Sequence, residues 1–304
     1  MLRQPPTREQ LRRALALVEG EVRWREPLAP LTSLQVGGPA DVLVIPADVE
    51  DVIRVIRGAH VNHIPLMVLG GTNVIIRDKG VRGMVMQLKH LTHIQEEADH
   101  LVYAQAGVRL PRLMQFALGR KLSGMEWAAG IPGTVGGGVV MNAGTRLGEM
   151  KDVLQAVDFI TANGKRKRIE ATMLTFLYRK TTLPKGIVVG AWLKLRAAAK
   201  ATIQSATKQY LQYRKATQPL TLPNAGSVFK NPIGDSAGRL IEAAGLKGLR
   251  MGDAEVSTKH ANFIVNRGTA TADDVLTVVR TVQAGVAKKF GVRLQLEWKV
   301  IGER

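Results

Sequence analysis

The chain has 304 residues, of which 45% are hydrophobic and 22% are charged, and it contains no cysteine. This composition is typical of a globular protein and argues against disordered and fibrous classes, while the lack of cysteine excludes disulfides, thiolate metal sites and thiol nucleophiles. No apolar run approaches the roughly 20 residues of a membrane span, and the first residues lack the apolar stretch of a signal peptide, so we expect a cytoplasmic protein that does not bind membranes.

The formal net charge is +18, from 43 Lys and Arg against 25 Asp and Glu. Residues 151–215 carry 14 basic and 3 acidic residues, which gives 14 − 3 = +11 of this excess. Three explanations are open: solvated surface charge, an anionic small-molecule substrate, and nucleic acid. Only 5% of the residues are aromatic and no nucleic-acid module is recognisable, so nucleic acid ranks third.

In the first half of the chain, apolar periodicity predicts a helix over residues 8–19, ending at Gly20, and then a strand from Asp41 to Ile45. Asp48 is placed to cap a helix whose apolar residues recur at helical spacing from Val49 onwards. Short apolar runs predict strands at 65–69, 73–77, 83–88 and 100–107, followed by a helix near 111–121.

The second half is predicted to contain strands at 154–162, 165–170 and 186–196, and then a helix over 197–216. A short helix at 237–245 and a strand at 261–266 follow. A long helix is expected from Ala272 to about Lys289, with Thr271 and Asp274 at capping-box spacing, and a strand closes the chain. The length of 304 residues favours two hydrophobic cores, because single cores stop growing near roughly 250–300 residues.

Two glycine-rich stretches follow predicted strands. In "VLGGTN", consecutive backbone N–H groups could form a nest for phosphate oxygens, although a tight turn explains the same residues: Gly70, Gly71, Thr72 and Asn73. "GMEWAAGIPGTVGGGVVMNAG", residues 124–144, has seven glycines among 21 residues. We expect a loop there and not a helix, because so many glycines disfavour a packed helix, and we expect a planar or pyrophosphate ligand to lie against its main chain.

Together with "MNAG", this loop resembles the FAD-binding domain of the vanillyl-alcohol-oxidase (PCMH) type, in the version used by UDP-N-acetylenolpyruvoylglucosamine reductases. Further blocks resemble the same family in order from about residue 31 to the C-terminus: "TSLQVGGPADVLVIP", "FLYRKTTL", "AGSVFKNP", "AGRLIEAAGLKG", "VSTKHANFIVN", "ATADDV" and "VRLQLEWKVIGER". The chain length and the lack of an extra insertion after "FLYRKTTLPKG" look like the family's shorter form.

The resemblance implies an α+β protein with an FAD-binding domain in two α/β lobes and a smaller α+β substrate-binding domain. We place a lead-in at 1–30, the FAD-binding domain at 31–198, a linker helix at 199–215 and the substrate-binding domain at 216–304. It further implies a monomeric enzyme that binds no nucleic acid. The implied reaction is the NADPH-dependent, FAD-mediated reduction of UDP-N-acetylglucosamine enolpyruvate to UDP-N-acetylmuramate for peptidoglycan synthesis.

Hydride addition to the terminal carbon of the enolpyruvyl group leaves a carbanion beside a carboxylate, which needs cations or hydrogen-bond donors placed beforehand. Three residues fall on the family's catalytic positions. Arg179 offers a planar fork that suits a carboxylate, and Ser227 is implied to donate the proton to the carbanion. Glu297, on the polar face of a predicted strand, could hold a proton if its pKa is raised. Without the resemblance, Arg179 and Glu297 would be read as surface charges and Ser227 as a turn residue.

The resemblance also assigns binding residues. For FAD they are Gly70, Gly71, Thr72, Asn73, Gly130, Ile131, Pro132, Gly133, Thr134, Gly136, Gly137 and Asn142. For the substrate they are Tyr178, Arg214, Lys230 and Asn231. We expect no metal, because the His pairs at 60 and 63 and at 90 and 93 lack a third ligand nearby.

Two departures from the family pattern stand out. "GGTN" is one residue shorter than the usual G-x-G-S-N, and the usual tyrosine and glycine of "NAGAYGGE" are replaced by Arg146 and Leu147. Two other readings remain: a different FAD-dependent oxidoreductase of the same fold, which would not need Arg179, Ser227 and Glu297 together, and a basic protein that binds anions or nucleic acid without turnover.

Overall fold

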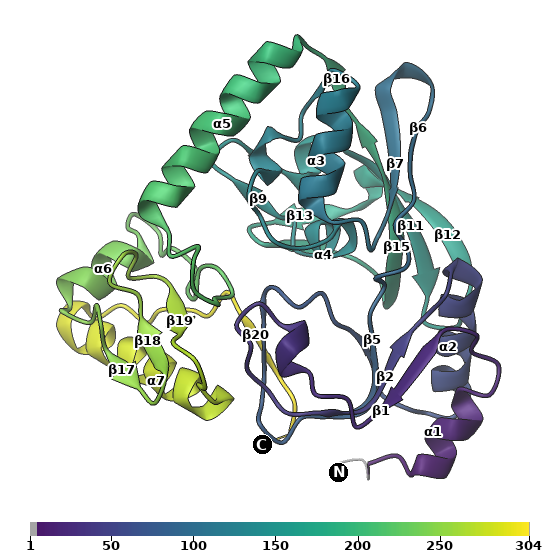
Figure 1. Cartoon of the computed structure of the whole chain (residues 1–304), viewed down its shortest axis with the longest axis horizontal. Coiled ribbons are helices and arrows are strands. Elements are labelled where there is room, and N and C mark those ends of the chain that lie inside the picture. The colour runs from purple at the N-terminus through teal and green to yellow at the C-terminus, as the bar shows by residue number, and fades with distance from the viewer. Residues whose placement is uncertain (1–4, 304) are drawn as a thin grey trace. The chain divides into compact units, whose positions relative to one another are not determined.

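The computed structural model describes residues 5–303. The chain forms two compact units and passes between them several times (Figure 1). Unit 1 contains residues 5–24, 42–70 and 83–212, and unit 2 contains residues 25–41, 71–82 and 213–303. Within residues 5–303 each unit has its own hydrophobic core, which confirms the expectation of two cores. The predicted domain bounds stay a prediction.

The first layer of unit 1 is a four-stranded sheet, in the order β1-β2-β5-β3. Its strands are β1 (Glu21–Trp24), β2 (Ala40–Ile45), β5 (Val81–Met86) and β3 (Leu66–Val68). Helices α1 (Arg8–Ala14) and α2 (Val49–Val61) pack against each other and against the same core. As predicted, Asp48 caps α2, because its Oδ1 accepts the Asp51 N–H at 2.8 Å.

Helix α1 ends at Ala14, so the prediction of a helix to residue 19 was too long. The buried carboxylate of Asp51 accepts the N–H groups of Glu19 and Gly20 at 2.9 Å each. These bonds hold the chain in a turn, because an amide that donates to a distant side chain is not available to an i−4 carbonyl of its own helix.

The second layer of unit 1 is a five-stranded antiparallel sheet, in the order β12-β11-β15-β7-β6. Its strands are β12 (Arg166–Glu170), β11 (Leu154–Thr161), β15 (Gly186–Lys194), β7 (Leu101–Gln105) and β6 (Ile94–Glu96). Unit 1 also contains three short antiparallel pairs: β8 (Leu122–Ser123) with β16 (Arg196–Ala197), β9 (Gly144–Thr145) with β10 (Gly148–Glu149), and β13 (Thr175–Leu177) with β14 (Lys180–Thr182). Helix α3 (Leu110–Gly119) belongs to the same unit. Single 3-10 turns of unit 1 lie at Ala98–His100, Glu126–Ala128, Met150–Asp152 and Ala171–Met173, and one of unit 2 lies at Ala29–Leu31.

Part of the second glycine-rich stretch is a helix, α4 (Val135–Val140), so the prediction that this stretch is a loop throughout was wrong. Thr134 begins the helix and accepts the Gly137 N–H at its Oγ1. The helix packs against β15 and β7. A Cβ at Gly136 would lie 2.9 Å from Ala106 Cβ, and one at Gly138 would lie 2.8 Å from Met150 Cε. Close packing against Ala106 therefore selects glycine at position 136, against its low intrinsic helix propensity, whereas the flexible end of Met150 could move at position 138.

A matched pair of substitutions tests this explanation. Gly136→Ala should destabilise the flavin-free protein by about 1–3 kcal/mol, because the new methyl group overpacks against Ala106. Gly137→Ala should stabilise it by about 0.4–1 kcal/mol, because the nearest atom to its new Cβ is Thr134 Oγ1 at 3.7 Å and alanine has fewer unfolded conformations. Urea unfolding measures both changes. Equal effects of the two substitutions would contradict the packing argument.

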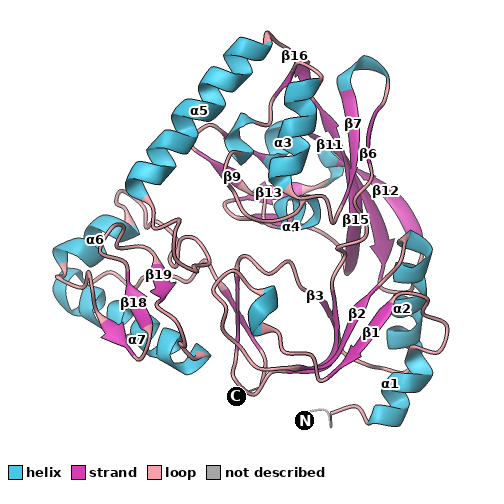
Figure 2. Cartoon of the chain, viewed as in Figure 1, coloured by secondary structure: helices cyan, strands magenta, loops and turns pink. Residues whose placement is uncertain are grey.

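Unit 2 contains the C-terminal third of the chain. The chain passes from unit 1 into this C-terminal part of unit 2 within α5 (Lys200–Thr217). The segment between α5 and α6 (Ala237–Ala243) is drawn as loop in Figure 2. The strands β17 (Arg250–Met251), β18 (Ala254–Val256) and β19 (Ile264–Asn266) form an antiparallel sheet beside α7 (Ala272–Phe290). Strand β4 (Val74–Ile76) pairs in parallel with β20 (Lys299–Ile301), which ties the inserted residues 71–82 to the chain end.

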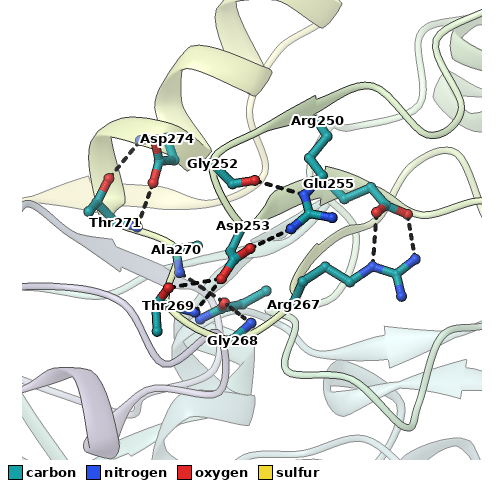
Figure 3. A network of polar contacts seen from close by, with 11 residues as sticks. Arg250, Gly252, Asp253, Glu255, Arg267, Gly268, Thr269, Ala270, Thr271 and Asp274 are labelled. Carbon is teal, nitrogen blue, oxygen red and sulfur yellow. Dashed lines mark hydrogen bonds and ion pairs between the residues drawn. The ribbon is translucent and has the colours of Figure 1, made fainter.

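Polar contacts fix the start of α7 to the three-stranded sheet (Figure 3). The Asp253 carboxylate accepts both the N–H and the hydroxyl of Thr269 at 2.8 Å each. Thr271 and Asp274 form the predicted capping box. Beside them, Arg267 makes a two-pronged ion pair with Glu255, both bonds being 2.8 Å. The sheet and the helix therefore form one hydrogen-bonded assembly.

The strand predicted near the C-terminus is shorter than expected. Residues 292–298 form no regular strand and make one isolated bridge, between Leu296 and Phe229, and the regular strand β20 starts at Lys299. The facing segment lies between Gly226, whose φ of +76° is outside the strand region, and Pro232, which has no N–H to donate, so the pairing is short. Leu294 and Trp298 are buried, as predicted for the apolar face. In residues 5–303, no helix combines the length and the apolar character needed to cross a membrane.

Candidate active site

Two of the three predicted catalytic residues, Ser227 and Glu297, lie on neighbouring segments of unit 2. The Glu297 N–H donates to the Val228 carbonyl at 2.8 Å, and the Lys230 N–H donates to the Gln295 carbonyl at 2.9 Å. Both Ser227 and Glu297 are partly exposed. Residues 70 positions apart in sequence are thus brought together by main-chain hydrogen bonds.

Ser227 follows a tight turn. Gly226 has a φ of +76°, and its N–H donates to Asn224 Oδ1 at 3.1 Å. The Asn224 side-chain amide in turn donates to the carbonyls of Pro219 and Leu222, at 3.0 and 2.8 Å. The left-handed conformation at residue 226 favours glycine, which explains why "AGS" is found here.

Asn73, predicted as a cofactor ligand, is bonded to the Glu297 segment. Its Nδ2 donates to the Glu297 carbonyl at 3.2 Å, and the Lys299 N–H donates to the Asn73 carbonyl at 3.1 Å. Asn73, Ser227 and Glu297 therefore lie on adjoining segments of unit 2. The sequence alone did not predict this neighbourhood, because it depends on the parallel pairing of β4 with β20.

Arg179, the third predicted catalytic residue, lies in unit 1 at the tip of the β13–β14 hairpin. Its φ is +56°, a left-handed conformation that is uncommon for a residue other than glycine and that often occurs at functional sites. The guanidinium lies over the Tyr178 ring, 4.9 Å from its centroid. The hairpin is anchored on α4, because the Thr181 hydroxyl donates to the Val139 carbonyl.

A hollow of about 490 Å³ opens beside this hairpin, lined by Thr145, Arg146, Glu149, Lys151, Tyr178 and Arg179 among others. Its two acidic side chains have partners within the protein: the Glu149 carboxylate accepts the Asn142 amide at 3.0 Å and pairs with Lys151, and Asp152 Oδ2 accepts the Glu149 N–H at 2.7 Å. Arg146 lies over the Tyr210 ring, 5.9 Å from its centroid. The two guanidinium groups, Arg146 and Arg179, make the hollow suited to an anionic group.

The glycine-rich stretches leave main chain open in the way that a bound flavin nucleotide needs. In the part of the chain that the structure describes, no atom outside its chain neighbours lies within 4 Å of a Cβ built at Gly70. Gly137 is open on one side, whereas Gly136 and Gly138 are packed. Gly71, Gly130 and Gly133 have positive φ angles of +80°, +69° and +134°, and Gly71 is packed against the Leu31 carbonyl. The open main chain at Gly70 and Gly137 therefore fits an FAD molecule that contacts the backbone there.

Two predicted flavin ligands already have structural partners. Asn142 is 1% exposed; its Nδ2 donates to Glu149 and its Oδ1 accepts the Lys151 N–H at 3.0 Å. Thr134 caps α4. The other predicted flavin ligands, Thr72, Ile131 and Pro132, lie within the same two glycine-rich stretches. Their contacts with FAD stay a prediction.

Of the predicted substrate ligands, Tyr178 is 52% exposed and lines the hollow. Lys230 is partly exposed on the segment that follows Ser227. Asn231 accepts the Ala237 N–H at its Oδ1, at 3.1 Å, and so holds the start of α6. Arg214 is only 8% exposed, and its Nε donates to Gln218 at 2.9 Å. Among residues 5–303, no group of three or more His, Asp or Glu is placed to hold a metal ion.

Asn262 is a residue of this region that the sequence analysis did not single out, although it lies in the quoted block "VSTKHANFIVN". Its side-chain amide bonds to both main-chain polar groups of Phe229, two residues after Ser227. The sequence contained one signal for it: Asn262 lies in the predicted strand 261–266, and asparagine is depleted in strands. An asparagine there indicates a specific role for its side-chain amide.

His260 supports Asn262 and gives a pH-dependent prediction. Its Nδ1 accepts the Asn262 N–H at 3.2 Å, and burial lowers its pKa below the usual 6.5. The unfolded chain therefore binds a proton at a higher pH than the folded protein does, so folding stability should fall as the pH drops below about 6.5. His260→Asn retains an acceptor without the titration, and its Tm should fall less between pH 7.5 and 5.5 than that of the unaltered protein. Parallel Tm profiles would contradict this role of His260.

The family comparisons agree with this geometry. Residues 40–170 match the family described as "FAD binding domain", and residues 218–301 match the family described as "UDP-N-acetylenolpyruvoylglucosamine reductase, C-terminal domain". The fold and the open glycine-rich stretches thus define a flavoprotein with an FAD-binding domain.

Similar proteins extend over nearly the whole chain. UDP-N-acetylenolpyruvoylglucosamine reductase 2 of Symbiobacterium thermophilum is 46% identical over 98% of this chain and 97% of its own length. The reductase of Geobacillus kaustophilus is 44% identical over 97% of this chain and 98% of its own length. The crystal structure of the Thermus caldophilus reductase superposes with a TM-score of 0.81 at 41% identity, covering 93% of this chain and 99% of that one. The chain belongs to the UDP-N-acetylenolpyruvoylglucosamine reductase family.

Proposed function

We propose that this protein reduces UDP-N-acetylglucosamine enolpyruvate to UDP-N-acetylmuramate with NADPH as the hydride source. The observation that carries the proposal is the main-chain pairing of the Ser227 and Glu297 segments, in a chain that matches this reductase family over 98% of its length. When bound, FAD supplies the chemistry that takes hydride from NADPH and delivers it to the enolpyruvyl double bond. The open main chain at Gly70 and Gly137 supports FAD binding by the two glycine-rich stretches.

Arg179 has the role of binding the substrate carboxylate and stabilising the negative charge that develops beside it. A guanidinium keeps its charge at any working pH and offers two parallel donors to a carboxylate. The strained φ of +56° at Arg179 supports this role, because the fold retains a conformation that a glycine would adopt at lower cost.

Ser227 donates a proton to the carbon that carries the carboxylate. A hydroxyl is a weak acid, so this step requires a strongly basic carbanion and an O–H group held in a fixed direction. Glu297 contributes a second carboxyl group on the neighbouring segment and serves as a proton reservoir for the site. Lys230 and Asn231 would donate to the diphosphate of the substrate, and Tyr178 and Arg214 would contact the rest of the molecule.

A purified preparation tests the proposal. We expect yellow protein with a flavin absorption band, and NADPH oxidation that depends on UDP-N-acetylglucosamine enolpyruvate. Colourless protein that does not take up added FAD would contradict flavin binding. Yellow protein that oxidises NADPH equally with and without this substrate would support a different flavin-dependent oxidoreductase of the same fold.

A further inference from the structure

Asn262 forms a clamp on the segment that follows Ser227. It is 3% exposed. The Phe229 N–H donates to Asn262 Oδ1 at 2.9 Å, and Asn262 Nδ2 donates to the Phe229 carbonyl at 2.8 Å. In addition, the Val228 N–H donates to the Asn262 main-chain carbonyl at 3.0 Å. A side-chain amide thus takes the place of a missing strand partner.

The same segment is held from its other side by the residues before β20. Glu297 donates its N–H to the Val228 carbonyl. All four main-chain polar groups of Val228 and Phe229 are therefore bonded, two of them to the Asn262 side chain and one to its main chain. Upstream, the Asn224 turn closes on Gly226. Ser227 lies between a closed turn and a fully bonded segment.

We propose that Asn262 is a positioning residue, which fixes the direction of the Ser227 hydroxyl and its separation from Glu297. This inference rests on the proposed reductase function. Proton donation by a hydroxyl tolerates little displacement, since a misplacement of about 1 Å can cost roughly 10²-fold in rate. A buried amide is costly unless it is bonded, and an apolar residue would suit this core position otherwise.

Two half-reactions, measured separately by stopped-flow absorbance of the flavin band, test the proposal. Asn262→Ala should leave the reduction of the flavin by NADPH unchanged and should slow its reoxidation by the enolpyruvate substrate by about 10–100-fold. Combined with Ser227→Ala, it should slow reoxidation no further than Ser227→Ala alone, to within about twofold, because it acts through Ser227.

Asn262→Asp gives a milder variant with a readout that a merely structural role would not produce. A protonated carboxyl group can accept the Phe229 N–H and donate to the Phe229 carbonyl, as the amide does, whereas a carboxylate can only accept. The reoxidation rate of Asn262→Asp, relative to the unaltered protein at each pH, should therefore recover as the pH is lowered. If Asn262→Ala does not fold, this pH profile decides the question.

Asn266→Ala is the matched control. Asn266 is also buried, at 1% exposure, and its side chain bonds to main chain at Leu34, Gly268 and Ala270 and not to the Ser227 segment, while its N–H, which the substitution keeps, donates to the Pro223 carbonyl. The Asn266→Ala protein should be less stable than the unaltered protein, but its reduced flavin should be reoxidised by substrate at the same rate. The inference is overturned if Asn262→Ala reoxidises at the normal rate, if its effect multiplies with that of Ser227→Ala, or if the Asn262→Asp ratio does not vary with pH. Failure of the unaltered protein to reoxidise with substrate would instead count against the proposed function.

Discussion

Ser227→Ala should slow reoxidation of the reduced flavin by UDP-N-acetylglucosamine enolpyruvate by about 10²–10⁴-fold, the usual contribution of a positioned acid. Reduction of the flavin by NADPH should be unchanged, because no proton from Ser227 enters that step. Rapid mixing of the reduced variant with substrate, in the absence of oxygen, gives the rate directly from the recovery of the flavin band.

Ser236→Ala is the control for this prediction. Ser236 caps α6 by accepting the Arg239 N–H at 3.2 Å, so the substitution should cost about 1 kcal/mol of stability. It should not change either half-reaction. Reoxidation of Ser227→Ala at the rate of Ser236→Ala would remove Ser227 from the role of proton donor.

Arg179→Gly should lower the reoxidation rate by about 10²–10³-fold, as the loss of a group that stabilises a developing anion does. The same substitution should raise stability by up to about 1 kcal/mol, because glycine adopts the left-handed conformation without the strain that arginine suffers. Urea unfolding of the flavin-free protein, together with the two half-reactions, measures this opposition between stability and function.

Lys121→Gly separates the two effects. Lys121 is an exposed residue of the same unit with a φ of +58°, so it should show a similar gain in stability with no change in either half-reaction. A loss of stability in Arg179→Gly beside a gain in Lys121→Gly would mean that the Arg179 side chain holds the hairpin together, and not that the backbone is strained for function.

Local signals in the sequence were sufficient for much of the fold. Asp48 caps α2, and Thr271 with Asp274 forms the capping box of α7, as their spacing predicted. Such bonds join residues three positions apart, so the sequence contains both partners within one turn. Four strands of the five-stranded sheet, β7, β11, β12 and β15, were likewise predicted from the sequence, whereas the short strand β6 was not.

The errors arose where distant contacts decide the structure. Glycine occupies position 136 of a helix because Ala106, thirty positions earlier, leaves no space for a side chain there. Residues 71–82 belong to unit 2 because β4 pairs with β20 near the chain end. Neither partner can be identified from local composition, and intrinsic propensity is overridden by tertiary packing in such cases.

The candidate site shows the same division. Arg179, Ser227 and Glu297 were found through the family resemblance, and their roles remain predictions. The bonds that surround them were not foreseen, above all those of Asn262, whose partner Phe229 lies 33 residues away. In the sequence, the only indication was an asparagine beside a run of apolar residues. Its burial and its bonds to Phe229 are known only from the folded structure.

The most direct test of the account is a single turnover. Flavin-loaded protein is reduced with one equivalent of NADPH without oxygen and is then mixed with UDP-N-acetylglucosamine enolpyruvate. We predict full recovery of the oxidised flavin band and the formation of one equivalent of UDP-N-acetylmuramate. A flavin that stays reduced until oxygen is admitted, with the substrate unchanged, would contradict the proposed function.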